Sequence, residues 1–227
     1  MSGWFITGTD TGVGKTRVAA ALLAALARSG IPAAGMKPVA SGCRETAQGL
    51  RNEDAERLAM AGAVRAAYAL INPYALPEPV APHLAARAAG VEIRLDVIRA
   101  AFEQMAARAP WVVVEGAGGW LTPINRDQTM ADVAKALGLP VILVVGLRLG
   151  CLNHALLTAA AIRRCGLALA GWVANRLDPG MQRLEENIET LSERLEVPWF
   201  TALPYAPQGF EMPAEKVQNL IEITEES

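Results

Sequence analysis

Cysteine is scarce in this chain, which argues against both a disulfide framework and a structural zinc site. The 227 residues contain three cysteines, Cys43, Cys151 and Cys165, an odd number that is widely separated along the sequence. Disulfide scaffolds need cysteines in pairs, and zinc knuckles need them at short spacings. We therefore expect all three thiols to be reduced.

The sequence also lacks an excess of either charge, and it lacks long hydrophobic runs. Its 21 Lys and Arg and 23 Asp and Glu leave a net charge of −2, so nucleic acid is not expected as a main partner. Every apolar run is interrupted by Gly, Pro or a charge before it reaches membrane-spanning length. The N-terminal residues show neither the basic nor the apolar region of a signal peptide. We expect a cytoplasmic protein without a membrane partner.

Lysine is scarce as well, with four copies against seventeen arginines. Lys37 follows the short apolar segment 32–36 and precedes Pro38, whose ring favours an extended chain. A lysine retained at the end of a buried strand, in a chain that otherwise uses arginine, indicates a candidate functional residue.

Residues 8–16, with the sequence GTDTGVGKT, form the most informative segment. They follow the apolar run 4–7 and precede an alanine-rich stretch with helical spacing, so the expected order is strand, turn, helix. In that context backbone N–H groups wrap a polyphosphate, the Lys15 ammonium reaches its β and γ oxygens, and the Thr16 hydroxyl ligates Mg²⁺. The loop departs from the common spacing because its first glycine is Gly8. The candidate nucleotide contacts here are Gly12, Val13, Gly14, Lys15, Thr16 and Arg17.

Apolar segments with the length of buried strands alternate with segments of helical periodicity. The expected strands are residues 4–7, 33–36, 111–114, 141–145, 168–173 and 199–202. The expected helices are residues 16–28, 52–60, 95–108, 130–137, 153–165 and 181–195. This alternation predicts an α/β protein with a three-layer P-loop NTPase-type fold, whose mostly parallel sheet carries helices on both faces. Because the proline-rich stretch 72–82 is too short to separate domains, residues 1–227 are expected to form one domain.

Polar residues that follow these strands are expected to meet at one edge of the sheet. Lys37, Glu115 and Asn175 all lie at carboxyl ends of strands, where the ligands of parallel sheets collect. Glu115 ends the apolar run 111–114, at the place where a carboxylate behind a phosphate loop is expected. Its carboxylate and the Thr16 hydroxyl are hard oxygen ligands of the kind that Mg²⁺ prefers.

Five motifs together resemble the dethiobiotin synthetase family. They are GTDTGVGKT at 8–16, KPVASG at 37–42, LRNED at 50–54, VEGAGG at 114–119 and GWVAN at 171–175. The resemblance runs from the first strand to about Glu211, and the combination is far more specific than a phosphate loop alone. It implies an ATP-dependent ligase of biotin synthesis that joins CO₂ to 7,8-diaminononanoate and closes a cyclic urea, releasing ADP and phosphate. ATP as co-substrate and Mg²⁺ as cofactor are implied with it.

The resemblance also implies roles for individual residues. Lys37 corresponds to the catalytic lysine that bridges the carbamate and the γ-phosphate, while Lys15, the second catalytic residue, holds the β and γ oxygens. From the residues alone, Asp54 would be interpreted as part of an acidic first helical turn. The implied metal ligands are Thr16, Asp54 and Glu115, and the implied contacts to the diamine or its carbamate are Thr11, Lys37 and Ser41.

The resemblance implies two further sets of contacts. The helix that starts near residue 151 is expected to take the substrate's carboxylate across a twofold interface, so a homodimer is implied; these residues are Gly150, Cys151 and Asn153. The remaining nucleotide contacts are Asp54, Glu115, Gly116, Ala117, Gly118, Asn175, Arg176, Pro204, Tyr205, Ala206 and Glu211. Gly12 departs from the family, which often carries an acid there, and Asp10 is a candidate substitute.

Three alternatives remain open on the sequence. Residues 175–178, Asn-Arg-Leu-Asp, are similar to a guanine-reading pattern, so GTP competes with ATP. A nucleotide switch of the partitioning and cell-division type shares this sheet, but it usually has a second loop lysine where this chain has Asp10. It also has a membrane-binding tail, for which segment 217–224 is short. A related amide-forming ligase would need a glutaminase partner or domain.

Overall fold

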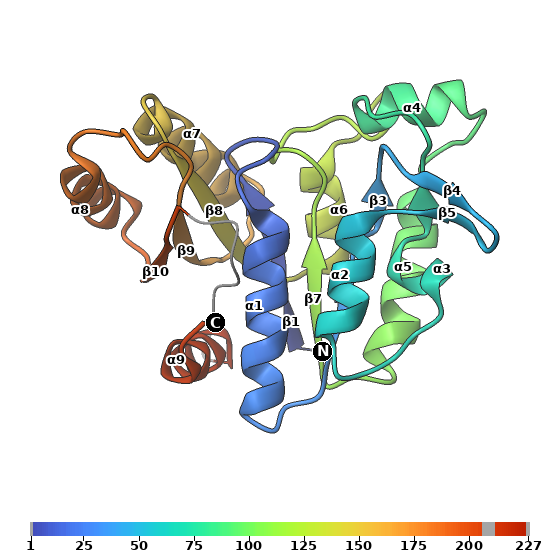
Figure 1. Cartoon of the computed structure of the whole chain (residues 1–227), viewed down its shortest axis with the longest axis horizontal. Helices are drawn as coiled ribbons and strands as arrows, with labels where there is room; N and C mark the ends of the chain where they lie inside the picture. Colours follow the sequence, from blue (N-terminus) through green and yellow to red (C-terminus); the bar gives the residue numbers. More distant parts are fainter. Residues whose placement is uncertain (1, 206–211, 226–227) are drawn as a thin grey trace.

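A six-stranded parallel sheet forms the centre of the protein, which the computed structural model describes at residues 2–205 and 212–225 (Figure 1). The strands lie in the order β10-β9-β8-β1-β7-β2, and all five neighbouring pairs are parallel. Their bounds are β1 (Ser2–Gly8), β2 (Ala33–Met36), β7 (Trp111–Glu115), β8 (Val141–Leu147), β9 (Leu169–Arg176) and β10 (Trp199–Leu203). All six expected strands are thus confirmed.

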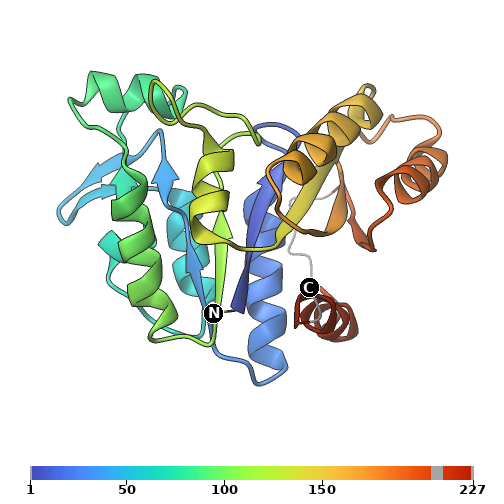
Figure 2. The same ribbon diagram turned by 180° about the vertical axis from the view of Figure 1, so that it is seen from behind.

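Helices cover both faces of the sheet, as Figure 1 and the reverse view in Figure 2 show. One face carries α1 (Lys15–Arg28), α2 (Glu53–Ala61) and α9 (Ala214–Glu225). The other carries α5 (Leu95–Ala106), α6 (Met130–Leu137) and α7 (Cys151–Arg164), with α8 (Leu184–Leu195) packed beside α7. The three-layer P-loop NTPase-type architecture predicted from the sequence is therefore confirmed.

Two apolar cores result, one on each face of the sheet. Trp4 and Ile6 of β1 pack in the core under α1 and α9, whereas Phe5 packs in the core under α5, α6 and α7. All three side chains are fully buried. Side chains alternate between the faces of a strand, and both faces are covered here, so the strands read as unbroken apolar runs in the sequence.

The chain reverses its direction of winding beside β1, and this positions the site. From β1 the chain passes through α1 on one face to reach β2, whereas from β7 it passes through α6 on the other face to reach β8. The loops after β1 and β7 therefore diverge and leave a crevice at the carboxyl ends of these strands. Such a switch point is where open α/β sheets bind their ligands.

Short elements between β2 and α5 were not predicted. They are β3 (Val39–Ala40) paired with β6 (Tyr74–Ala75), the antiparallel hairpin of β4 (Arg44–Thr46) and β5 (Gly49–Arg51), α3 (Tyr68–Ile71) and α4 (Pro82–Ala88). Strands of two or three residues are too short to produce a periodic pattern. The proline-rich stretch 72–82 turns out to contain β6 and the start of α4.

Two helix starts differ from expectation by two or three residues, and one helix was missed. The helix α7 begins at Cys151 rather than 153, because Gly150 takes a left-handed φ of 95° at its N-cap. The helix α8 begins at Leu184 rather than 181, since the preceding residues form a turn that ends at Arg183 with φ 55°. The helix α9 was treated only as a short tail, yet it buries Val217 and Leu220 against the sheet.

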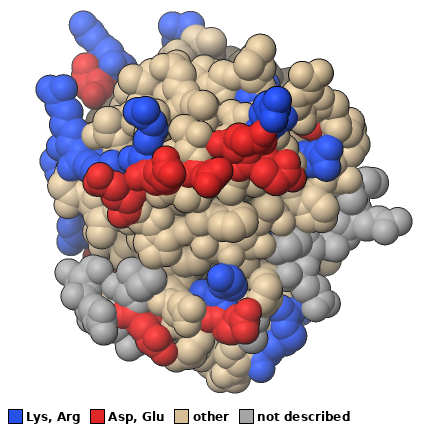
Figure 3. All heavy atoms as spheres, turned by 90° about the vertical axis from the view of Figure 1, so that its left-hand side faces the viewer, with Lys and Arg blue, Asp and Glu red and all other residues tan. Residues whose placement is uncertain are grey.

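The side of the molecule that α8 covers carries both acidic and basic side chains on its surface (Figure 3). Figure 3 shows a band of acidic side chains there, and the exposed residues of α8 include Glu185, Glu186, Glu189 and Glu193. In the described part of the chain, no helix combines the length and the apolar character that crossing a membrane requires.

Candidate functional site

A cleft of about 790 Å³ opens at the carboxyl end of the sheet, where β1 and β7 end and α1 and α2 begin. It brings together most of the residues that the sequence analysis proposed. The proposed residues that line it are Thr11, Gly12, Gly14, Lys15, Thr16, Arg17, Lys37, Ser41, Asp54, Glu115, Ala117 and Gly118. Segments more than a hundred residues apart in the sequence thus share one cavity.

The phosphate loop presents unpaired backbone groups to this cleft. Gly14 is the N-cap of α1, with φ 94° and no side-chain hydrogen bond to the first turn. The N–H groups at the helix start are therefore available to an anion, and the helix dipole favours negative charge there. A β-carbon on Gly14 would lie 2.3 Å from the Asn175 side-chain nitrogen, so only glycine fits.

Lys15 is a buried ammonium that has no carboxylate within ion-pair distance among the described residues. Its Nζ donates to the carbonyl oxygen of Asp10 at 2.9 Å, and the residue is 6% exposed. Burial, followed by repulsion from the Lys37 charge, lowers the pKa of Lys15 to about 8. An arriving polyphosphate would supply the counter-charge that this cation lacks.

Lys37, which lines the same cleft, lies between two carboxylates. Its Nζ is 2.6 Å from Glu115 Oε1 and 3.4 Å from Asp54 Oδ2. Burial opposes the charge on Lys37, but Glu115 and Asp54 together outweigh it and raise the pKa of Lys37. The Thr16 hydroxyl donates to the same Glu115 Oε1 at 2.9 Å, so Lys37 and Thr16 both contact one oxygen of Glu115.

These oxygens suit a magnesium ion in chemical type. Glu115 is 1% exposed, and its Oε2 accepts no hydrogen bond from the described residues. That free buried acceptor, the Thr16 hydroxyl and the half-exposed Asp54 carboxylate make a hard oxygen donor set. Among the described residues there is no cluster of three His, Cys, Asp or Glu side chains, so the hydroxyl would be one of the ligands.

Asn175 lies under the phosphate loop rather than in the cleft lining. Its Nδ2 donates to the carbonyl of Val13 at 2.7 Å, and its Oδ1 accepts from Arg17 at 3.3 Å. The side chain is 2% exposed. In this arrangement Asn175 braces the loop, and the neighbouring Arg176 donates to the Pro179 carbonyl.

Several proposed residues lie beside the cleft rather than in it. The start of α7, with Gly150, Cys151 and Asn153, does not line the cavity, but Arg148 just before it pairs with Asp10 at 2.6 Å. Val13 and Gly116 are buried beneath the loop ends, while Pro204 and Tyr205 are exposed after β10. Ala206 and Glu211 lie outside the described residues.

Asp10, the candidate substitute for an acid at residue 12, has both carboxylate oxygens engaged. One oxygen accepts the backbone N–H of Thr11 at 2.7 Å, and the other is held by Arg148. These two partners lower the pKa of Asp10, with the Thr11 N–H contributing most. The pair connects the phosphate loop to the segment that precedes α7.

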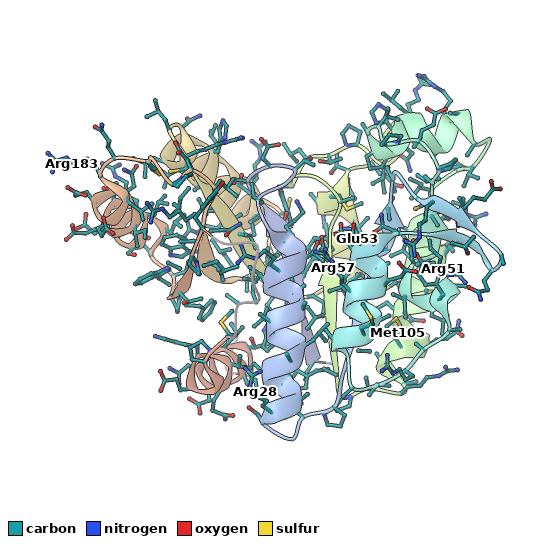
Figure 4. The ribbon with its side chains drawn as sticks, viewed as in Figure 1. Arg28, Arg51, Glu53, Arg57, Met105 and Arg183 are labelled. Atoms are coloured by element: carbon teal, nitrogen blue, oxygen red, sulfur yellow. The ribbon has the colours of Figure 1, made fainter. Side chains whose placement is uncertain are left out.

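The sequence interpretation missed the far wall of the cleft. Asn52, Arg57, Thr122 and the proline-rich residues 79–82 also line it. Figure 4 shows Arg57 and Glu53 extending from α2 beside α1, and their side chains pair at 2.5 Å. Two sequence signals pointed to this wall, the motif at 50–54 that contains Asn52 and the proline-rich stretch 72–82, but neither indicated by itself that these residues line the cleft.

Comparison with known proteins shows to which family the chain is similar. A family profile described as an AAA domain matches residues 2–211. The protein named ATP-dependent dethiobiotin synthetase BioD from Xanthomonas oryzae pv. oryzae is 53% identical over 218 residues, covering 92% of this chain and 97% of the relative. A protein of the same name from Xylella fastidiosa strain 9a5c is 53% identical over 209 residues, covering 92% of each.

Solved structures share the fold at much lower identity. The MinC:MinD cell division protein complex of Aquifex aeolicus matches with a TM-score of 0.57 at 16% identity, covering 100% of this chain and 95% of the other. A ParA family ATPase from Chlorobium tepidum TLS matches with a TM-score of 0.55 at 13% identity, covering 100% and 92%. These likenesses show the fold alone, so the switch-type alternative has only a distant structural relationship behind it. The curated relatives, in contrast, place this chain in the family of ATP-dependent dethiobiotin synthetases.

Proposed function

We propose that this protein uses ATP to close the cyclic urea of dethiobiotin from 7,8-diaminononanoate and CO₂. The observation that carries the proposal is the position of Lys37, which lies between Glu115 and Asp54 in the same cleft as the phosphate loop. The family membership of the chain supports the same reaction. The products are dethiobiotin, ADP and phosphate.

The reaction proceeds in three steps that need no protein nucleophile. One amine of the substrate adds to CO₂ and loses a proton, giving a carbamate. A carbamate oxygen then attacks the γ-phosphorus and ADP leaves, giving a carbamic–phosphoric anhydride. The second amine attacks the carbonyl carbon, and phosphate and a proton leave as the ring closes. Such chemistry depends on positioning and on stabilisation of negative charge.

The two lysines supply that stabilisation in different places. Because the pKa of Lys37 is raised, it stays an ammonium at neutral pH and acts as a cation, not as a base. We assign Lys37 to the carbamate and the transferring phosphoryl group, and Lys15 to the β and γ oxygens. Ser41, whose hydroxyl is buried without a hydrogen-bond partner among the described residues, is assigned to the carbamate together with Thr11.

Thr16, Asp54 and Glu115 are the residues that would hold Mg²⁺. When bound, the ion supplies Lewis-acid polarisation of phosphate oxygens. The phosphate loop is assigned to the phosphates of the nucleotide, together with Gly116, Ala117 and Gly118 after β7. A last group, at the end of β9 and after β10, is assigned to the nucleoside. The last group comprises Asn175, Arg176, Pro204, Tyr205, Ala206 and Glu211.

A homodimer and a cytoplasmic location complete the proposal. The segment that starts α7, with Gly150, Cys151 and Asn153, would receive the substrate's carboxylate from a second copy's site. Leu149 beside it is 98% exposed, and Leu157 on the same helix is 62% exposed. Apolar side chains this exposed next to a proposed ligand site are typical of a contact surface.

The direct test is incubation of the protein with the diamine, bicarbonate and Mg-ATP, followed by mass spectrometry. We expect a product that has gained a carbonyl and lost two hydrogens, formed in step with ADP. Parallel reactions with GTP and CTP establish the nucleotide preference. Absence of the product under all three nucleotides, with a folded protein, would exclude the ligase function.

A further inference from the structure

The backbone of Lys37 is held from outside the main sheet. Strand β2 is an edge strand that ends at Met36, and the Lys37 N–H donates to the Ile71 carbonyl at 2.8 Å. Asn72 Nδ2 donates to the Lys37 carbonyl at 2.7 Å and to the Tyr74 carbonyl at 3.3 Å. Both backbone groups of Lys37 are therefore bound by residues at the end of α3.

Asn72 is in turn connected to the helix that carries Asp54. Its Oδ1 accepts from the Tyr68 hydroxyl at 3.2 Å, and that hydroxyl oxygen accepts the Asn52 N–H at 2.8 Å. Asn52 is the N-cap of α2, where its side chain accepts the Ala55 N–H at 3.2 Å. Asp54 lies in the first turn of this helix and its carboxylate faces Lys37 Nζ.

These contacts close a ring that links the two ends of one ion pair. From Lys37 the ring passes through Asn72, Tyr68 and Asn52 to Asp54, and returns through the 3.4 Å ion pair. Asn72 is 3% exposed, and Arg51 covers the Tyr68 ring at 4.1 Å. Burial raises the pKa of Tyr68, so its hydroxyl keeps the proton that it donates to Asn72.

We propose that Tyr68 and Asn72 are positioning residues, which together fix Lys37 and the Asp54-bearing start of α2 at the distance that phosphoryl transfer needs. Neither residue lines the cleft, so neither is a catalytic residue. The inference rests on the proposed function for its kinetic consequence. A displacement of about 1 Å in a positioned group can cost about a hundredfold in rate.

The test compares Tyr68→Phe with Tyr74→Phe. Both substitutions remove one hydroxyl and keep the ring, and Tyr74 OH also accepts a backbone N–H at a helix start, that of Arg94 at 3.0 Å. The two hydroxyls differ in their contacts among the described residues, because that of Tyr68 bonds to Asn72 and to the Asn52 N–H at the start of α2, whereas that of Tyr74 bonds to Arg94. We expect similar falls in Tm, but a kcat at least about tenfold lower for Tyr68→Phe with KM for ATP within about twofold. For Tyr74→Phe we expect both constants within about twofold of the parent.

A second measurement does not depend on turnover. In Tyr68→Phe, amide hydrogen exchange should accelerate at residues 52–55 and 37, whereas Tyr74→Phe should leave these amides unchanged. Equal kcat in the two variants, or unchanged exchange at residues 52–55 in Tyr68→Phe, would overturn the positioning role. A parent protein that makes no cyclic urea would instead refute the proposed function, and the exchange data would still decide the positioning.

Discussion

Lys15 and Lys37 are both buried and line one cleft, but their surroundings shift their pKa values in opposite directions. Lys37 has Glu115 and Asp54 as partners, so its charge is stabilised before any ligand binds. Within the described part of the chain, Lys15 has only the Asp10 carbonyl as a hydrogen-bond partner, and its pKa is lowered to about 8. A bound polyanion should therefore stabilise the charged form of Lys15 more than that of Lys37.

Nucleotide binding should take up a proton near pH 8. In the free protein Lys15 is about half protonated there, and phosphates favour its charged form, so uptake of up to about half a proton is expected. As the pH rises above 8, Lys15 of the free protein loses its proton, and protonating it on binding costs free energy, so the affinity for the nucleotide falls. Calorimetry of a non-hydrolysable ATP analogue with Mg²⁺, in buffers of different ionisation enthalpy, measures the uptake. Lys15→Arg, which stays charged, should bind without it; equal uptake in both proteins would contradict the assignment.

Removal of the Lys37 side chain should act on turnover rather than on nucleotide binding. We expect Lys37→Ala to lower kcat by at least about a hundredfold, because the lost cation faces the transferring group. Its Kd for the ATP analogue should stay within about threefold of the parent. Thermal unfolding will report the cost of leaving Glu115 unpaired, and Lys135→Ala, on the exposed face of α6, is the matched lysine control. Parent-like kcat in Lys37→Ala would remove Lys37 from the mechanism.

At the scale of elements, the phosphate loop is fixed by contacts from β9 as well as by its own turn. Gly12 and Gly14 both have positive φ, 74° and 94°. A side chain at residue 12 would meet nothing within 4 Å, whereas one at residue 14 would collide with Asn175, which bonds to Val13. A substitution at Gly12 therefore measures backbone strain alone, whereas one at Gly14 adds the displacement of the Asn175 side chain from the loop.

Gly14→Ala should therefore weaken nucleotide binding far more than Gly12→Ala. Both changes carry a left-handed backbone penalty of about 1–2 kcal/mol. Only Gly14→Ala also forces Asn175 away from the loop, so we expect its Kd for the ATP analogue to rise at least about tenfold, or about 1.4 kcal/mol. For Gly12→Ala we expect a change below about threefold. Titration calorimetry on folded variants decides, and equal Kd values would show that the Asn175 brace is irrelevant to binding.

At the scale of the whole molecule, the proposed dimer should depend on the exposed leucines beside α7. A charge placed at the centre of an apolar contact is buried without a partner, which opposes association. Light scattering should give the parent twice the mass of one chain, and Leu149→Glu a mass nearer to that of one chain at micromolar concentration. The matched control is Met60→Glu on α2. Met60 is similar in size to leucine and 68% exposed, and its substitution should leave the dimer intact. A parent that runs as a single chain would refute the dimer.

Elements with strong local patterns were predictable, and short or distant ones were not. All six sheet strands were predicted because each is a contiguous apolar run. The hairpin of β4 and β5 and the short α3 were missed, since three or four residues cannot show a period. The helix α9 was misjudged because its burial depends on the sheet face it covers, which the segment 214–225 does not itself reveal.

The sequence by itself determined the phosphate loop, the strand and helix alternation and the identity of the rare lysines, because those signals lie in adjacent residues. Only the tertiary structure decided that Thr16, Lys37, Asp54 and Glu115 converge, and that Asn175 lies under the loop. Their meeting depends on the order of strands in the sheet and on which face each crossover helix takes. Contacts between residues a hundred positions apart are set by that packing, and no local pattern in the chain encodes the distances.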